Sequence, residues 1–249
     1  MTQNEIKYYS SLLKKKYRNS ERKFLAEGKK IVEEGLNSKF FCEKIFVSQK
    51  FFVNSRSKKI FKTSEYEILN KSELLRLTDT VNPQGILAAF RIPPAKKIET
   101  VSSNIVVFLE NISDPGNLGT IIRTCDWFGI DTILSGENTV DAFNPKVIRS
   151  SMGSIFHLDI IDEVEVESLS KLKYMGYKLV VADTSGEGIY NFKLSEKIII
   201  AFANETVGPS ENLLEKSDYK VTVPRIGKAE SLNVAAASAV ILSELTKFN

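Results

Sequence analysis

The sequence predicts an α/β protein in which a small α/β domain precedes a larger domain built on a parallel sheet. Strand-like and helix-like segments alternate regularly after residue 103, which indicates a parallel sheet covered by helices on both faces. The run Asn104–Glu110 (NIVVFLE) is almost continuously apolar, as is typical of a strand buried on both sides. We expect a first domain over residues 1–92, a linker over 93–102 and a second domain over 103–249.

The boundary rests on the segment Arg91–Lys97 (RIPPAKK), whose two prolines disfavour helix and remove backbone donors. Charge also changes sign there. Residues 1–97 carry 21 Lys and Arg against 10 Asp and Glu, whereas residues 98–249 carry 13 against 21, for a net charge of +3. This asymmetry predicts that the first domain meets a polyanion. A lysine-rich solvated surface is the alternative explanation.

Short elements alternate in the first domain. A helical period runs through IKYYSSLLKKKYR. Strands are expected at CEKIFVS, YEIL and GILAAFRI, with a helix at KSELLRLT.

The second domain alternates more clearly. After the strand NIVVFLE, further strands are expected at DTILS, FHLDII, KLVVAD, KIIIAFA and YKVTVP. Helices are expected between and after them at LGTIIRTCDWFG, NPKVIRSSMG, ESLSKLKYMG, SENLLEKS and LNVAAASAVILSELTKF. We expect His157 on a strand in a structural role, Cys125 as a small core residue and Trp127 packed in the core.

Composition excludes several classes of protein. No apolar run reaches the roughly 18 residues that a membrane span needs, and the first residues lack the apolar core and cleavage site of a signal peptide. The two cysteines, Cys42 and Cys125, are far apart and lack metal-ligand spacing. We therefore expect a cytoplasmic protein with no metal and no membrane partner.

Three strands are followed by loops rich in polar and small residues, and in parallel sheets ligands usually bind beyond the carboxyl ends of strands. The first loop, Glu110–Thr124 (ENISDPGNLGTIIRT), contains Asn117, which could cap the next helix, and Arg123, six positions later on what we expect to be the same side. Turn chemistry explains Asp-Pro-Gly but explains Arg123 less well. The loop lacks the glycine patterns of dinucleotide and P-loop sites.

The second loop follows the apolar run ending at Ala203 and contains Asn204, Glu205 and Gly208. Glu205 could accept hydrogen bonds from a ligand or cap the following helix.

The third loop, Val223–Asn233, includes Pro224, Gly227, Ser231 and Leu232. Helix capping explains Ser231 or Asn233, but not the whole set.

Together these loops resemble the three motifs of the SpoU branch of the SPOUT methyltransferases. The first motif is similar to DPGNLGTIIRT, the second to FANETVGPS and the third to VPRIGKAESLNVAAA. The segments YRNSERKFLAEGKKIVEEGL and TVNPQGILAAF resemble the family's substrate-recognition domain, which is L30e-like. Ala203 departs from the pattern, in which glycine is usual, and Arg225 replaces a commoner methionine.

The resemblance implies transfer of a methyl group from S-adenosylmethionine to a ribose 2′-hydroxyl of RNA, with 23S rRNA favoured and transfer RNA as the alternative. It implies a parallel-sheet SPOUT domain with a deep C-terminal trefoil knot, and a homodimer. Catalytic roles fall on Arg123, Asn117, Glu205, Ser231 and Asn233, and cofactor contacts on Ala203, Asn204, Gly208, Val223, Pro224, Gly227 and Leu232.

The role of Arg123 can be narrowed by its chemistry. A guanidinium is almost never neutral, so we expect Arg123 to pair with an RNA phosphate and position the hydroxyl rather than to act as a simple base. Basic residues of the first domain are expected to contact phosphates without reading bases; these are Lys14, Lys15, Lys16, Arg18, Arg22 and Lys23.

Two further hypotheses stay open. The chain could be a non-catalytic RNA-binding protein that kept the fold, or a small-molecule enzyme with a Rossmann-type sheet.

Overall fold

The computed structural model describes residues 1–54, 64–193 and 197–247. The chain divides into two units. One comprises Met1–Pro94 together with Asp141–His157, and the other comprises Ala95–Val140 and Leu158–Asn249. The segment 141–157 therefore belongs with the N-terminal residues, although it follows a strand of the second unit. This division differs from the single boundary that the prolines predict.

The N-terminal unit is built on a mixed four-stranded sheet in the order β1-β4-β2-β3. β4 is antiparallel to β1 and β2, and β3 is parallel to β2. Its elements are α1 (Gln3–Ser11), α2 (Lys15–Glu21), β1 (Lys23–Glu27), α3 (Lys29–Leu36), β2 (Cys42–Ser48), α4 (Gln49–Asn54), β3 (Tyr66–Leu69), α5 (Lys71–Leu77), β4 (Ile86–Arg91), α7 (Pro145–Ser151) and the 3-10 turn η3 (Ser154–Phe156).

Sequence patterning predicted three of these strands and α5 to within two residues at each end. The expected N-terminal helix is interrupted, because α1 ends at Ser11 and α2 begins at Lys15. β1, α3 and α4 were not predicted.

Each face of this sheet carries its own apolar layer. Side chains alternate across a strand, so Leu25 and Phe24 lie on opposite faces. The face of Leu25 packs with α1 and α5; its layer comprises Ile6, Tyr9, Leu12, Leu25, Phe46, Leu69, Leu74, Leu77, Leu87 and Ala89. The face of Phe24 holds an aromatic cluster of Phe24, Phe40, Phe90, Phe143 and Phe156.

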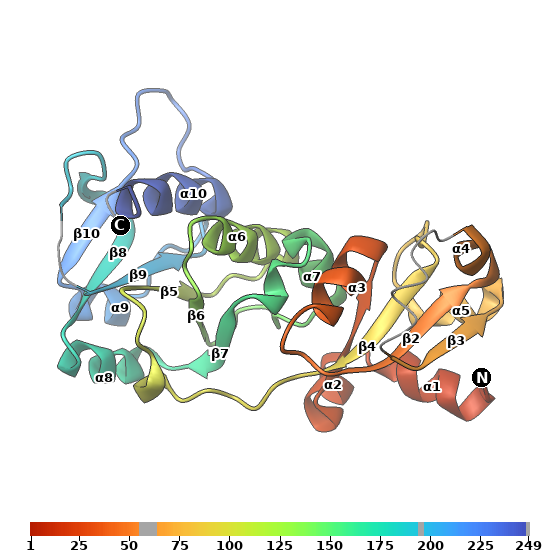
Figure 1. Ribbon diagram of the computed structural model, residues 1–249. Helices are drawn as coiled ribbons and strands as arrows, with labels where there is room; N and C mark the ends of the chain where they lie inside the picture. Colours follow the sequence, from red (N-terminus) through yellow and green to blue (C-terminus); the bar gives the residue numbers. More distant parts are fainter. Residues whose placement is uncertain (55–63, 194–196, 248–249) are drawn as a thin grey trace. The chain divides into compact units, whose positions relative to one another are not determined.

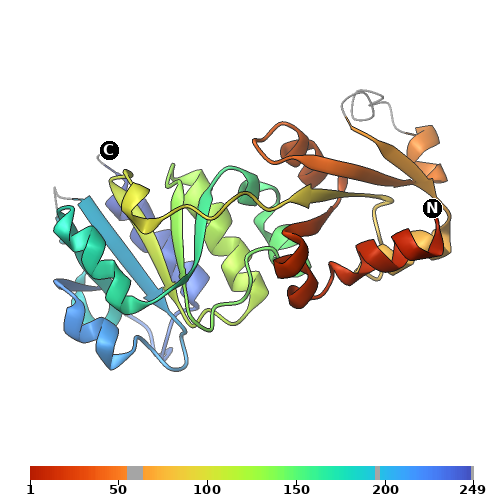
Figure 2. The same ribbon diagram turned by 90° about the horizontal axis from the view of Figure 1, so that it is seen from below.

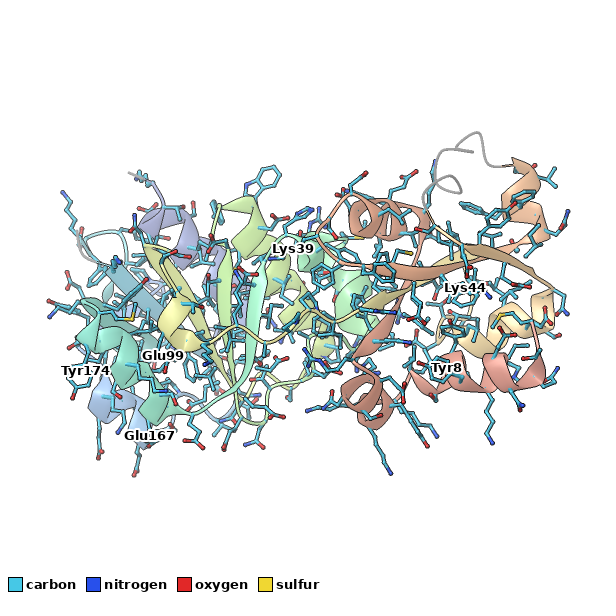
Figure 3. The ribbon with its side chains drawn as sticks, turned by 60° about the horizontal axis from the view of Figure 1, so that its bottom comes forward. Tyr8, Lys39, Lys44, Glu99, Glu167 and Tyr174 are labelled. Carbon is cyan, nitrogen blue, oxygen red and sulfur yellow. The ribbon has the colours of Figure 1, made fainter. Side chains whose placement is uncertain are left out.

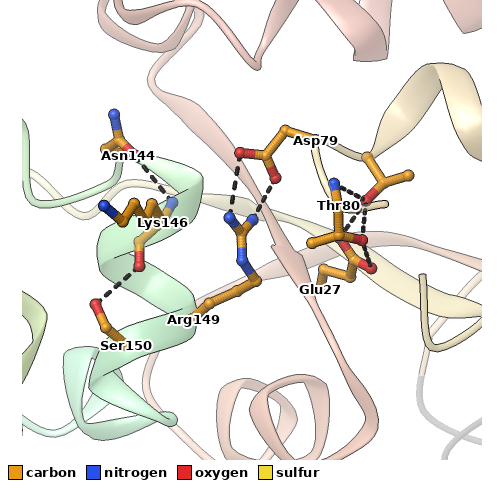
Figure 4. A network of polar contacts seen from close by, with 8 residues as sticks. Glu27, Asp79, Thr80, Asn144, Lys146, Arg149 and Ser150 are labelled. Carbon is orange, nitrogen blue, oxygen red and sulfur yellow. Dashed lines mark hydrogen bonds and ion pairs between the residues drawn. The ribbon is translucent and has the colours of Figure 1, made fainter. Parts of the chain in front are cut away.

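The segment 141–157 is held by this aromatic layer and by ion pairs. Phe24 lies 4.8 Å from Phe143 between ring centroids. Gly35 leaves room for this packing, because a Cβ there would overlap the rings of Phe90 and Phe156. Arg149 on α7 forms a two-pronged pair with Asp79, close to the carboxylate of Glu27 and the hydroxyl of Thr80, as Figure 4 shows.

Polar contacts also tie the outer side of the N-terminal unit together. The Tyr8 hydroxyl donates to Glu21, and Lys44 pairs with Glu67 at 3.2 Å; Tyr8 and Lys44 are labelled in Figure 3. The backbone N–H of His157 ends η3 by donating to the Ser154 carbonyl oxygen. The Nε2 atom of His157 lies 3.4 Å from Glu34 Oε2. The prediction of a strand at His157 was wrong, because the chain turns through η3 first and β7 begins at Asp159.

The second unit is built on a six-stranded sheet in the order β10-β8-β9-β5-β6-β7, and every neighbouring pair is parallel. This confirms the predicted α/β class. Its elements are η2 (Ile98–Thr100), β5 (Ile105–Glu110), α6 (Pro115–Trp127), β6 (Thr132–Gly136), β7 (Asp159–Val164), η4 (Val166–Ser168), α8 (Leu169–Tyr174), β8 (Tyr177–Gly188), β9 (Lys197–Ala203), α9 (Glu211–Lys216), β10 (Tyr219–Thr222) and α10 (Val234–Leu245). Phe248, the last residue of the predicted final helix, lies outside the described residues.

Helices cover both faces of this sheet. α6 and α10 lie side by side on one face, and α8 and α9 lie on the other (Figures 1 and 2). On β5, Val106 and Phe108 join the layer under α8 and α9, whereas Val107 and Leu109 are equally buried on the alternate face. Burial on both sides explains the unbroken apolar runs in the sequence.

Two expectations need correction here. Ile98 and Val101, within the predicted linker 93–102, are each 7% exposed and belong to the core of the second unit. The chain is thus packed into the second unit at Ile98 and Val101. Trp127, expected in the core, is 81% exposed at the last position of α6, because the buried stripe of that helix runs through Ile121, Ile122 and Cys125 instead.

Candidate active site

Three loops leave the carboxyl ends of strands in the second unit. β5 and β9 are neighbours, and their last residues, Glu110 and Ala203, are partners in the ladder. β10 lies on the far side of β8, which pairs with β9. All pairs are parallel, so the loops that follow Glu110, Ala203 and Thr222 emerge at one edge of the sheet.

The first loop leads into α6, and the capping of this helix leaves the Asn117 side chain available for other contacts. Asp114 caps α6 by accepting the backbone N–H of Asn117 at 2.8 Å, and Pro115 occupies the first helical position. The expectation that Asn117 caps the helix was therefore wrong. Its side-chain amide is not used by α6 and reaches the other loops.

The third loop ends at Asn233, whose side-chain oxygen and nitrogen make separate sets of hydrogen bonds. Its Oδ1 caps α10 by accepting the N–H groups of Ala235 and Ala236 at 3.0 and 3.3 Å. Its Nδ2 is left over and points at the first two loops. Capping alone explains the oxygen of Asn233 but not the direction of its amide nitrogen.

Asn117, Glu205 and Asn233 meet in a hydrogen-bonded cluster, which we call the amide–carboxylate cluster. Asn233 Nδ2 donates to Asn117 Oδ1 at 3.1 Å and to Glu205 Oε1 at 3.4 Å. Asn117 Nδ2 donates to the same Glu205 oxygen at 3.3 Å. Glu205 does not cap the next helix, since Ser210 has that role. One residue from each loop is thus in mutual contact.

Arg123 and Ser231 are not part of this cluster. Both side chains are exposed, and neither has a hydrogen bond or ion pair among the residues that the structure describes. Six positions along a helix correspond to a rotation of about 600°, so Arg123 lies about 120° around α6 from Asn117. The expectation that the two share one side was wrong.

The predicted cofactor residues fall into two groups. Asn204 is engaged in its own loop, where its Oδ1 accepts the N–H groups of Thr206 and Val207 at 2.8 and 3.3 Å. Gly208 has a φ of +75°, which favours glycine. Ala203 is 9% exposed at the strand end, so its methyl group is accommodated within the fold.

The remaining predicted cofactor residues, in the third loop, are more open. Val223 is half-buried and Pro224 is exposed, and Leu232 is 47% exposed. Gly227 does not have a left-handed φ, and a Cβ there would meet no atom within 4 Å. Its predicted need for a tight turn is therefore not evident in the fold itself.

The basic residues of the N-terminal unit are not equivalent. Lys14, Lys15 and Lys16 are exposed around the start of α2. Arg18 is only 2% exposed and donates to Asp141 Oδ2 at 2.6 and 2.8 Å and to the Leu12 carbonyl oxygen at 2.9 Å. Its expected phosphate contact does not fit this burial, because all of its nitrogens are already used within the fold.

Arg22 and Lys23 are intermediate cases. Arg22 is exposed and donates to the Pro93 carbonyl oxygen. Lys23 pairs with Glu43 at 2.7 Å. Burial acts to lower the pKa of Lys23, but hydrogen bonds to Glu43 and Tyr8 outweigh it and raise the pKa.

Two features were missed by reasoning from the sequence. Glu110 carries a carboxyl group but is only 6% exposed; its position at the end of an apolar run was the available signal. Phe41 is 59% exposed beneath the Arg91 guanidinium, which lies 4.7 Å from the ring centroid. No sequence pattern distinguishes this phenylalanine from its buried neighbour Phe40.

Several other features bear on the chemistry. Cys125 is fully buried, as predicted, and burial raises the pKa of its thiol. Among the described residues, no group of three or more His, Cys, Asp or Glu side chains is placed to hold a metal ion. No helix in the described part of the chain is long and apolar enough to cross a membrane.

Comparison with known proteins gives a consistent result over both units. The sequence profile of the SpoU rRNA methylase family matches residues 104–243, and that of the MRM3-like substrate binding domain matches residues 3–88. The 23S rRNA (guanosine(2553)-2′-O)-methyltransferase RlmP of Bacillus subtilis is 34% identical over 97% of this chain and 95% of its own length.

Solved structures agree. The AdoMet-bound rRNA methyltransferase from Sinorhizobium meliloti is 26% identical, with a TM-score of 0.85 over 98% of this chain and 94% of that one. The crystal structure of an RNA 2′-O ribose methyltransferase is 28% identical, with a TM-score of 0.80 over 98% and 95%. With a matching family profile over more than half of its length and a 34% identical relative along nearly all of it, the chain belongs to the SpoU rRNA methylase family.

Proposed function

We propose that this protein transfers a methyl group from S-adenosylmethionine to a ribose 2′-hydroxyl of 23S ribosomal RNA. The observation that carries the proposal is the amide–carboxylate cluster, in which Asn117, Glu205 and Asn233 meet from three loops at one edge of the sheet. Support for the reaction and for the RNA comes from the relatives, two of which are described as 2′-O-methyltransferases.

The residues around the cluster fit S-adenosylmethionine. The open backbone at Gly227 and the exposed side chain of Leu232 offer a surface for a ligand that combines polar edges with a flat ring. The left-handed Gly208 shapes the second loop, and Ala203, Asn204, Val223 and Pro224 complete the two cofactor loops. The cofactor, when bound, supplies the activated methyl group.

The protein's own contribution is to orient the RNA. Asn117 and Asn233 present amide groups of fixed direction, since each is held by the other and by Glu205. Ser231, two residues before the α10 cap, adds an exposed hydroxyl that no described residue uses. Accurate positioning of reacting groups can contribute about 7–11 kcal/mol of a barrier, which is why the cluster needs to be rigid.

Arg123 has the freedom that a phosphate contact needs. Its exposed guanidinium is not used by any described residue, and a guanidinium matches phosphate oxygens in a two-pronged geometry. We assign it to binding the RNA backbone beside the target ribose, with the phosphate or Arg123 receiving the hydroxyl proton late in the reaction.

The N-terminal unit is proposed to bind the RNA, with Lys14, Lys15 and Lys16 as its exposed phosphate contacts. We further propose a homodimer, because Ile226 and Val207 beside the site are 101% and 78% exposed and symmetric dimers are the commonest oligomers. The proposed trefoil knot is supported by the return of the chain from the edge strand β10 to pack as α10 against α6. A cytoplasmic location accords with an rRNA substrate.

The experiment that tests the function is deletion of the gene, followed by mapping of 2′-O-methyl marks across cellular RNA. We expect the loss of one mark in 23S rRNA, restored by the wild-type gene and not by Arg123→Ala. The guanosine equivalent to the target of the B. subtilis relative is the first position to inspect.

Other results would point elsewhere. A mark lost from transfer RNA would move the substrate to that class. An intact set of marks, together with no heat of S-adenosylmethionine binding by calorimetry, would favour a non-catalytic RNA-binding protein.

A further inference from the structure

A buried carboxylate lies beneath the second loop of the site. Glu110 is the last residue of β5 and is 6% exposed. Its backbone pairs with Ala203, the residue immediately before the loop 204–209. Its side chain accepts two hydrogen bonds from Ser210, the residue immediately after that loop: from the backbone N–H at 2.8 Å and from the hydroxyl at 2.6 Å. One residue therefore contacts both ends of the loop.

We propose that Glu110 is a positioning residue for methyl transfer, which acts by closing the loop 204–209 so that Glu205 is held against Asn117 and Asn233. The inference rests on the proposed function. Glu110 does not touch the amide–carboxylate cluster in any described contact, so its effect on the site passes through Ser210 and the loop.

The directions of the hydrogen bonds make this closure specific. The Ser210 hydroxyl accepts the Leu213 N–H at 3.2 Å as the cap of α9. Its proton is consequently directed at Glu110 Oε1. An ionised carboxylate is acceptor-only, so each of its oxygens takes one of the two Ser210 protons. A neutral amide at this position would present N–H groups toward one of those donors.

The start of the loop 204–209 is held by the residue that follows Glu110 in the sequence. Asn111 has a φ of 57°, and its carbonyl oxygen accepts Asn204 Nδ2 at 3.4 Å. Asn204 also binds the loop internally, because its carbonyl oxygen accepts the Gly208 N–H at 2.8 Å. The end of β5 thus fixes the loop at both sides of Glu205.

Burial makes the arrangement sensitive to Glu110. A charged group removed from water needs hydrogen bonds to remain there, and the two from Ser210 are those that the structure gives it. If Ser210 loses its hydroxyl, the carboxylate loses half of its donors and draws in water or moves. Either change releases the segment that carries Glu205.

The test compares Glu110→Gln, Ser210→Ala and the double variant in the full-length protein. The matched control is Asp218→Asn. Asp218 accepts the Leu179 N–H at 2.8 Å and pairs with Lys173 at 3.0 Å, so its loss also removes a carboxylate–backbone bond, but before β10 rather than at the site.

Two readouts separate positioning from stability. Hydrogen exchange in the free protein should speed up at Thr206, Val207 and Gly208 in both single site variants and not in the control. The rate constant kcat on rRNA, measured well below the melting temperature, should fall roughly tenfold or more in each. The double variant should be no worse than the poorer single one, because both changes remove the bond between the Ser210 hydroxyl and Glu110. The α9 cap, which Ser210→Ala also removes, is already lost in that single variant.

The outcomes are distinguishable. Unchanged loop exchange and unchanged kcat in Ser210→Ala would overturn the inference while leaving the proposed function intact, as would losses that multiply in the double variant. An equal loss of kcat in Asp218→Asn would indicate that Glu110 contributes to stability and does not position the loop. If Glu110→Gln does not fold, Ser210→Ala decides alone. If the wild-type protein methylates no rRNA, the proposed function fails while loop exchange still reports on Glu110.

Discussion

The side-chain amide of Asn233 donates to the side-chain oxygen of Asn117 at 3.1 Å, across a sequence separation of 116 residues. This contact joins the start of α10 to the start of α6. Helix capping fixes the backbone at both ends of the bond, since Asp114 caps α6 and Asn233 caps α10. The two amides are therefore positioned by the starts of two capped helices.

Changing Asn233 to Asp should separate capping from site geometry. A carboxylate still accepts the N–H groups of Ala235 and Ala236, but it cannot donate to Asn117 and places a second negative charge beside Glu205. We expect the melting temperature to change little and methyl transfer to fall sharply. Asn233→Ala should in addition lose about 1 kcal/mol of stability from the lost cap, measured by denaturant unfolding. Full activity in Asn233→Asp would contradict a role for the amide donor.

Changing Arg123 should alter catalysis and not folding. The side chain is exposed and makes no hydrogen bond or ion pair with other described residues, so Arg123→Ala should change stability by less than about 0.5 kcal/mol. We expect kcat to fall about 100- to 1,000-fold, as when a transition-state donor is removed. Arg123→Lys keeps the charge and loses the fork; near wild-type turnover in that variant would argue against two-pronged phosphate binding.

Changing Arg18 should lower the stability of the fold. The guanidinium and Asp141 form a buried ion pair, and removing one partner leaves an uncompensated charge at a cost of about 3–5 kcal/mol. Arg18→Ala and Asp141→Ala should both lower the free energy of unfolding by this amount. For Lys15→Ala, an exposed neighbour, we expect no measurable change. A stable Arg18→Ala protein with weakened RNA binding would restore the phosphate role.

The exposed lysines should govern the salt dependence of RNA binding. Each phosphate contact contributes a slope of about 0.7 for single strands and 0.9 for duplex in a plot of log affinity against log salt. Lys15→Ala and Lys16→Ala should each reduce the slope by up to that amount, measured by fluorescence anisotropy at several salt concentrations. An unchanged slope in the double variant would identify these lysines as part of a solvated surface.

Cys125 should be inert to alkylation in the native state. Burial raises the pKa of its thiol, and only the thiolate reacts, so at about pH 8 the group stays protonated as well as inaccessible. Iodoacetamide treatment followed by mass spectrometry should label Cys125 only after unfolding in concentrated guanidinium chloride. Labelling of the native protein at the rate of a free thiol would show that α6 opens.

The central strands β5 and β9 could be predicted because they are buried on both faces and read as apolar runs. The three loops could be recognised because their polar residues follow those runs. β1 was missed because Lys23 and Glu27 frame only three buried residues, too few for a pattern. Whether Trp127 is exposed or Arg18 is buried depends on partners far along the chain, such as Asp141, that no local period reveals.

The choice of helix-capping residue also could not be predicted from the local sequence. Asp114, Asn117, Ser231 and Asn233 are all competent caps by residue type, and only the position of the first helical turn decides among them. Pro115 was a usable signal for the start of α6. The start of α10 has no such proline, so Ser231 and Asn233 were both candidate caps.

The segment 141–157 has a consequence for exchanging recognition modules among such enzymes. A chimera that replaces only residues 1–94 would deprive its new N-terminal part of the carboxylate of Asp141 and the rings of Phe143 and Phe156. A graft that carries 141–157 along with 1–94 would transplant the complete hydrophobic interior. Sequence divergence in either piece must therefore be matched in the other, so the two stretches are expected to evolve as a pair.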